Sequence, residues 1–178
     1  GSTNKDSLHL NYTGSFDYLY TYDHYQNSEH AFLLNADLNE RFRSGNIFGL
    51  EAGAGHYATS NSIDSTNNTL ISLNPWFGKS SSEFIYRIGV GMVLDFQGEK
   101  VDPLFFPEAH LQINMVRGVL MPYFGVGGHM QVNNYRTVAE ENRYVRPGLK
   151  VKNTQHKIRG YVGLKGSFSR QFSYDLRA

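Results

Sequence analysis

The sequence contains no cysteine, no long hydrophobic run and almost no net charge. The absence of cysteine excludes a disulfide framework and a thiolate metal site. A formal net charge of +1, with the basic residues spread along the chain, gives no reason to expect nucleic-acid binding. No apolar run approaches the roughly 20 residues that a transmembrane helix needs. Alanine is sparse, whereas glycine, tyrosine and phenylalanine are abundant, and this composition favours β-structure over helix.

The most regular stretch of the sequence, residues 8–22, alternates apolar and polar side chains. A strand places successive side chains on opposite faces, so this stretch would have one apolar and one polar face. It is much longer than the roughly 5–6 residues of an ordinary strand, and it is typical of a membrane-spanning β-strand. Its alternating apolar positions are Leu8, Leu10, Tyr12, Phe16, Tyr18, Tyr20 and Tyr22.

Eight further segments repeat this period-2 pattern, at 32–42, 48–54, 71–77, 84–96, 105–115, 120–132, 158–164 and 172–176. The 48–54 segment is the weakest, because glycine disfavours strands. The connections alternate in length, as between the outer loops and periplasmic turns of an outer-membrane barrel. The pattern therefore predicts an all-β, antiparallel up-and-down transmembrane β-barrel. The expected short turns are 44–46, 79–81, 117–118 and 167–170, and the expected long loops are 23–29, 58–68, 97–104 and 133–153.

The predicted apolar faces carry almost no charge, which matches a lipid-facing surface. Glu40 is the main exception, and it lies near a strand end where a long side chain can reach water. The prolines at 75, 107 and 122 are expected near strand ends, where a missing N–H does least harm. Aromatic residues gather near the segment ends and predict two interfacial girdles. These are Tyr18, Tyr20, Tyr22 and Phe105 toward the long loops, and Phe42, Phe77, Phe84, Tyr86, Phe172 and Tyr174 toward the short turns.

We expect a single β-barrel domain over residues 1–178, with residues 1–6 as a tag or N-terminal extension. Bacterial barrels have an even number of strands, and the pattern gives about nine. The favoured interpretation is part of a larger barrel, with further strands after Ala178. Two alternatives are a partner chain that supplies the missing edge, and a closed barrel of eight strands without the weak 48–54 segment.

The polar faces supply the candidate lumen residues. They could set the selectivity of a pore, or they could form compensating ion pairs in a filled interior. Glu108, His110 and His129 fall close together in the predicted register and could form a metal site or an acid–base pair. Their spacing matches no known ligand motif, so a set of hydrated lumen residues is the favoured interpretation. The complete lumen set is Asp37, Arg41, Glu51, Arg87, Asp95, Glu108, His110, His129, Lys157, Arg159 and Lys165.

The longest predicted loop, 133–153, is rich in charged and tyrosine residues. Loops on a rigid scaffold often carry binding functions, so we expect either a partner-binding loop or a solvated surface loop. The candidate binding residues are Tyr135, Arg136, Glu140, Glu141, Arg143, Tyr144 and Arg146.

Several short motifs point to a known family. They are Phe-Pro-Glu-Ala at 106–109, the glycine-rich strand Pro-Tyr-Phe-Gly-Val-Gly-Gly at 122–128, Ala-Glu-Glu-Asn at 139–142, Arg-Pro-Gly-Leu at 146–149 and Lys-Asn-Thr at 152–154. Together they resemble the barrel region of TonB-dependent-receptor-like outer-membrane proteins of the Bacteroidetes type. The resemblance implies a β-barrel fold in the bacterial outer membrane and assigns no substrate.

These expectations give porin-like or receptor-like transport of an unknown solute as the leading function. One alternative is a non-transporting structural or docking subunit of an outer-membrane complex. A further alternative is a soluble lipid-binding up-and-down barrel with an apolar interior. We expect no enzymatic activity and no cofactor. The expected partners are outer-membrane lipid and other outer-membrane or surface proteins.

Overall fold

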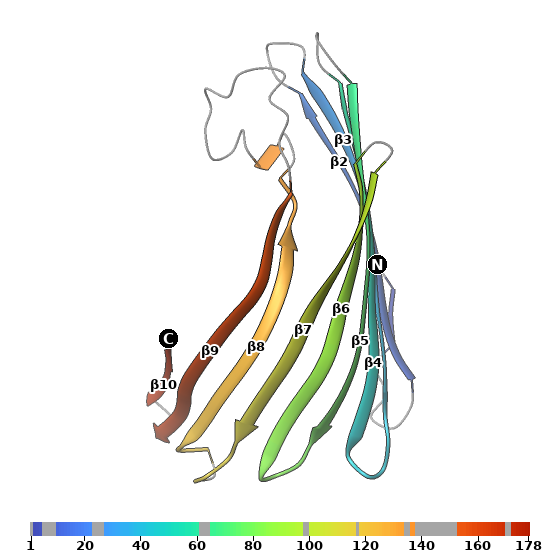
Figure 1. The fold of residues 1–178 in the computed structure, drawn as a ribbon. Coiled ribbons are helices and arrows are strands. Elements are labelled where there is room, and N and C mark those ends of the chain that lie inside the picture. The colour runs from blue at the N-terminus through green and yellow to red at the C-terminus, as the bar shows by residue number, and fades with distance from the viewer. Residues whose placement is uncertain are drawn as a thin grey trace.

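Ten strands form one antiparallel sheet, and each strand pairs with its neighbours in the sequence (Figure 1). The structure is a computed structural model that describes residues 2–4, 10–22, 27–60, 65–97, 100–116, 118–133, 136–137, 153–169 and 172–178. The sheet is curved and is not closed, because β1 and β10 are the two ends of the strand order. The strands are β1 (Ser2–Asn4), β2 (Leu10–Tyr22), β3 (Ser28–Arg41), β4 (Asn46–Ser60), β5 (Ser65–Ser80), β6 (Phe84–Gln97), β7 (Lys100–Ile113), β8 (Met121–Gln131), β9 (Thr154–Ser169) and β10 (Phe172–Arg177).

The nine predicted strands are confirmed as β2 to β10, and the all-β antiparallel up-and-down topology is confirmed with them. The glycine-rich segment, predicted as the weakest, is the long strand β4. The sequence pattern missed β1, which pairs antiparallel with β2 through Ser2 opposite Gly14 and Asn4 opposite Tyr12. A three-residue strand is too short to show a period-2 pattern.

The connections at one rim are shorter than predicted. β4 and β5 remain paired as far as Ser60 opposite Ser65, and β6 and β7 as far as Gln97 opposite Lys100. The predictions of long loops at 58–68 and 97–104 are therefore wrong. These residues are polar, and a hairpin can continue with polar side chains on both faces where water surrounds it. The predicted alternation of long and short connections consequently fails at these two places.

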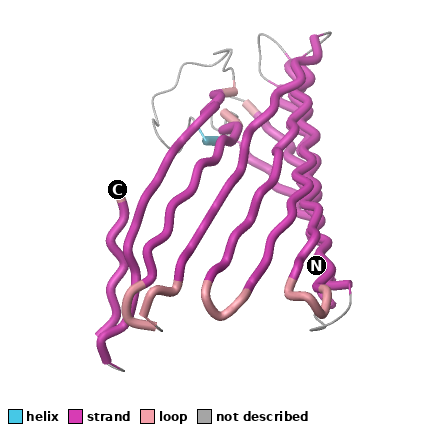
Figure 2. The backbone as a smooth tube through the Cα atoms, turned by 60° about the horizontal axis from the view of Figure 1, so that its bottom comes forward, coloured by secondary structure: helices cyan, strands magenta, loops and turns pink. Residues whose placement is uncertain are grey.

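The opposite rim carries the turns after β3, β5, β7 and β9 (Figure 2). The predicted turn after β3 is confirmed, with Gly45 at a φ of 82°. The two-residue turn predicted at Arg117-Gly118 is wrong, because β7 ends at Ile113 and β8 begins at Met121. Gly118 nevertheless occupies a turn at a φ of 74°, next to an isolated bridge between Val116 and Leu120.

Two prolines lie inside strands rather than near their ends, contrary to the prediction. Pro75 is in β5, and the paired positions between β5 and β6 are interrupted between Leu73 and Trp76. Pro107 is in β7, and the paired positions between β7 and β8 begin only two residues later, at Ala109. Proline has no N–H to donate to a ladder, which accounts for the breaks beside both residues.

The two faces of the sheet differ in polarity as the alternation predicted. Large apolar side chains on one face are exposed, including Phe16 at 63%, Ile88 at 58% and Phe105 at 66%. Arg87, the residue before Ile88, instead lies within a polar network on the other face. Among the described residues, the buried hydrophobic set is limited to Ala31, Leu70, Phe106 and Tyr123. The apolar face therefore has no second protein layer against it.

The sheet bends toward its polar face. Asn153, the residue before β9, donates hydrogen bonds to Asp95 on β6 at 3.1 and 3.2 Å, although β7 and β8 lie between these strands in the sheet. The same side chain accepts a hydrogen bond from Asn68 on β5. The polar face is therefore concave and the apolar face convex. Within the described residues, no helix is long and apolar enough to cross a membrane.

Aromatic rings form rows near both rims of the convex face. Contacts between Tyr18 and Phe32 and between Tyr20 and His30 lie toward the rim where β2 ends. Near the short-turn rim, ring contacts run continuously from β4 to β6. That row consists of Phe42, Phe48, Phe77, Tyr86 and Phe84.

Candidate functional site

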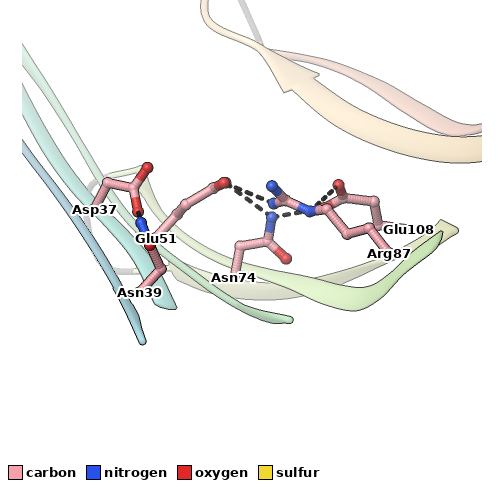
Figure 3. A network of polar contacts seen from close by, with 6 residues as sticks. All are labelled: Asp37, Asn39, Glu51, Asn74, Arg87 and Glu108. Carbon is pink, nitrogen blue, oxygen red and sulfur yellow. Dashed lines mark hydrogen bonds and ion pairs between the residues drawn. The ribbon is translucent and has the colours of Figure 1, made fainter. Parts of the chain in front are cut away.

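The concave face carries a charged network that spans four strands, β4 to β7 (Figure 3). Arg87 on β6 donates a hydrogen bond to Glu51 Oε1 on β4 at 2.6 Å. Its Nε lies 2.8 Å from Glu108 Oε1 on β7, an ion pair without hydrogen-bond alignment. The amide of Asn74 on β5 donates to both carboxylates, at 3.1 Å to Glu51 and 2.7 Å to Glu108. One guanidinium and one amide therefore hold two carboxylates across the width of four strands.

The indole ring of Trp76 supports this network from the side. The Arg87 guanidinium lies over the ring, 4.3 Å from its centroid, in a cation–π contact. Trp76 lies between two glycines, Gly49 on β4 and Gly89 on β6. A Cβ at Gly49 would overlap the indole ring, and a Cβ at Gly89 would lie 3.0 Å from the Trp76 Cβ. The inner face of a curved sheet has less room than the outer face, so large side chains alternate with glycine there.

Two cavities flank the network. One, of about 310 Å³, has polar and carboxylate lining from Thr13, Asp37, Glu51, Ser72 and Asn74 among others. The second, of about 340 Å³, extends from Glu108 toward Phe106 and Met130. Both volumes are near the lower end of the range for small-molecule sites, about 300–1,000 Å³. The first cavity offers hydroxyl, amide and carboxylate groups, which suit a polar or cationic solute.

The strands β8 to β10 carry a different cluster on the same face, built from tyrosines. Tyr161 on β9 lies over Gly125 on β8, and its hydroxyl is 2.9 Å from His110 Nδ1 on β7. Tyr123 on β8 lies over Gly163 on β9 and donates a 2.7 Å hydrogen bond to Asp175 on β10. Cations cover both rings. Lys165 Nζ is 5.5 Å from the Tyr123 ring centroid, and the Arg177 guanidinium is 4.3 Å from that of Tyr161.

The structure brings together only part of the predicted lumen set. Glu51, Arg87 and Glu108 meet in the charged network, while His110 and Lys165 belong to the tyrosine cluster. Asp95 is buried near the rim that lies away from the short turns, where it accepts a hydrogen bond from Asn153. Asp37 accepts a 3.4 Å hydrogen bond from Asn39, beside the smaller cavity. The remaining members, Arg41, Lys157 and Arg159, are exposed on β3 and β9.

The predicted grouping of His129 with Glu108 and His110 is not observed. The β8–β9 register shifts between Gly127 and His129. A bulge of this kind redirects the side chains beyond it. His129 is exposed and stacks on His156 with ring centroids 4.8 Å apart. Within the described part of the chain, no three His, Asp or Glu side chains converge as a metal site.

Of the predicted partner-binding loop, Arg136 lies in the described structure and is half-buried. The other predicted loop residues lie outside the described residues; they are Tyr135, Glu140, Glu141, Arg143, Tyr144 and Arg146.

The site also contains residues that the sequence analysis did not select, chiefly Asn74, Trp76, Tyr123, Tyr161 and Asp175. A usable signal was present in the glycines. Trp76, Tyr123 and Tyr161 each lie opposite a glycine of a paired strand. Finding these pairs requires the register between strands, and the period-2 pattern within one strand does not supply it.

Comparison with models of protein families, with curated proteins and with solved structures gives no match. The polarity of the two faces and the geometry of the concave face are the features of the molecule that bear on its function.

Proposed function

We propose that this chain forms the wall of a bacterial outer-membrane β-barrel, of the TonB-dependent-receptor-like type, that conducts or takes up a polar solute along its concave face. The observation that carries the proposal is that neighbouring residues of one strand lie on opposite faces of the sheet and differ in polarity. Ile88 is 58% exposed on the convex face, whereas Arg87 joins two carboxylates on the concave face. Lipid-facing strands of membrane barrels alternate in this way, with apolar side chains outward and polar ones inward.

The strand order supports the same proposal. All neighbouring strands are antiparallel, and β1 and β10 also run in opposite directions as the first and last of ten. Two such edges can pair with each other, or with further strands, without a crossover. Closure is required in a bilayer, because every backbone group must find a partner there. The polarity of the faces also opposes the soluble lipid-binding alternative, which needs an apolar concave face.

Conductance in planar bilayers tests the transport proposal. In the network, two carboxylates and one guanidinium leave an excess of one negative charge. We expect the wild-type protein to conduct and to prefer cations. A Glu51→Gln/Glu108→Gln variant reverses the sign of this local charge and should shift the preference toward anions. Unchanged selectivity in a variant that still conducts would contradict a solute path along the network.

A non-transporting docking barrel is the second candidate, and one observation favours it. At the end of the sheet near the 133–153 loop, Asn153 joins β9 to Asp95 and Asn68 across the concave face. Phe106 is also buried there, beside Gly128 of β8. This arrangement narrows the proposed solute path along the concave face at that end of the sheet. Efficient membrane insertion without any conductance would support the docking barrel.

A further inference from the structure

A groove crosses the convex face between β5 and β8. Its volume is about 630 Å³, and its lining is almost wholly apolar, from Phe77, Tyr86, Ile88, Ala109, Leu111 and Phe124 among others. Ala109 lies opposite Ile88 on β6 and Val126 on β8. The groove therefore has a methyl group at its floor and larger side chains on both sides.

A cation lies toward the short-turn end of the same face. Lys79 is two residues after Phe77 on β5 and lies directly opposite Tyr86 on β6. Phe77 and Tyr86 both line the groove. Its ammonium is 6.0 Å from the centroid of the Phe84 ring. Among the described residues, Lys79 forms no ion pair with a carboxylate. A half-buried lysine that forms no ion pair among the described residues, beside an apolar groove and the aromatic row, is complementary to an amphiphile with an anionic head.

We infer that this groove binds one acyl chain of an anionic phospholipid, and that Lys79 binds the lipid phosphate. The inference rests on the proposed function, because it requires the convex face to meet lipid. It goes beyond the proposed function because it assigns one lipid molecule to one groove of the convex face. The Lys79 ammonium would contact the phosphate at the level of the aromatic row, and the chain would run over Ala109 toward the middle of the sheet.

Native mass spectrometry of the full chain in detergent micelles tests the inference, with phosphatidylglycerol and phosphatidylcholine of identical acyl chains as probes. We expect one phosphatidylglycerol to be retained per chain, and roughly fivefold weaker retention of phosphatidylcholine. Lys79→Gln should remove this preference, whereas Arg43→Gln, which changes an exposed cation at the same rim, should keep it. Ala109→Trp should fill the groove and abolish retention of both lipids. Ala54→Trp, at an exposed alanine of β4 on the same face, should leave retention unchanged.

Equal retention of the two lipids by the wild-type protein would overturn the assignment of Lys79. Equal lipid retention by the Ala109→Trp and Ala54→Trp variants would overturn the groove assignment. A lipid-free dimer that Ala109→Trp dissociates would identify the groove as a contact between copies and would also overturn the inference. Insertion into lipid vesicles is measured in parallel for every variant. If the wild-type protein fails to insert, the proposed function fails; if all variants insert and retain lipid alike, only the inference fails.

Discussion

The β4–β7 part of the concave face holds its charged side chains against one another, whereas the β8–β10 part holds tyrosines against glycines and places its cations over the rings. Arg87 contacts two carboxylates in addition to the Trp76 ring, whereas the cation contacts of Lys165 and Arg177 are with aromatic rings. The β7–β8 seam joins the two parts through the described pairs Ala109–Gln112 with Tyr123–Val126. The comparison shows that one curved sheet can fill its inner face by two kinds of packing. In both parts a glycine lies opposite the ring that contacts the cation: Trp76 in the first part, and Tyr123 and Tyr161 in the second.

The largest effect is expected from substituting the glycines that lie opposite Trp76 and Tyr123, because these rings occupy the space that a side chain at the glycine would fill. Gly49→Ala would place a methyl group into the Trp76 ring, and Gly163→Ala would do the same to Tyr123. Each substitution should lower the free energy of unfolding by about 1–3 kcal/mol, because overpacking forces neighbouring side chains out of position. Urea unfolding from lipid vesicles measures the change.

Gly160→Ala is the matched control, since nothing lies within 4 Å of a Cβ at that position on β9. It should be neutral or slightly stabilising, because alanine loses less conformational entropy than glycine on folding. Equal destabilisation by Gly160→Ala and Gly163→Ala would mean that general strand effects, and not the ring contacts, explain the glycines.

A smaller effect is expected from the charges, and it should differ between the two parts. Arg87→Gln leaves Glu51 and Glu108 without their shared cation and should cost about 1 kcal/mol, since the three side chains are 28–39% exposed. Adding Glu51→Gln and Glu108→Gln to this variant should recover part of the loss. Lys165→Gln removes only a cation–π contact and should cost about 0.5 kcal/mol. Urea titration at low and high salt checks both values; a larger cost for Lys165→Gln would reverse the comparison.

The last comparison is local and concerns the seam between the two parts. The chain has no cysteine, so an introduced pair is unambiguous. Leu111 lies opposite Phe124 in the β7–β8 seam, and Leu38 lies opposite Leu50 in the fully paired β3–β4 ladder. The two disulfides would close loops of similar length and so constrain the unfolded chain equally.

We expect the Leu111→Cys/Phe124→Cys disulfide to slow amide hydrogen exchange in β8 by about tenfold, because among the described ladders from β2 to β10 this seam has the fewest paired positions and should open first. The Leu38→Cys/Leu50→Cys disulfide should change exchange in β4 by less than about twofold, since that ladder is paired along its length. Mass spectrometry of deuterium uptake measures both. Similar protection by the two disulfides would show that the seam is no weaker than the ladder.

Much of the fold follows from local patterning, and the parts that were missed depend on pairing between strands. The alternation in residues 8–22 and in β6 places Phe16 and Ile88 on the apolar face as expected. The ends of β4 and β5 were missed because polar residues extend a hairpin without an apolar signal. The position of His129 was missed because the β8–β9 bulge shifts the register.

The candidate site was only half predictable for the same reason. Alternation places Glu51, Arg87 and Glu108 on the polar face, but it cannot show that their side chains meet across four strands. The register places Glu108 opposite Gly89, two residues from Arg87, and it also places Trp76 between two glycines. The sequence pattern therefore placed these charged residues on the polar face, but it did not select the amide and aromatic residues that contact them.

The central claim, that the convex face meets lipid and the concave face does not, is tested most directly by tryptophan quenching in vesicles with brominated acyl chains. Trp76 is the single tryptophan of the chain and lies on the concave face against Arg87. Its fluorescence should stay close to that in unbrominated vesicles. A Trp76→Phe/Ile88→Trp variant places the tryptophan on the convex face and should be strongly quenched. Strong quenching of native Trp76 together with weak quenching of the Ile88→Trp variant would contradict the account.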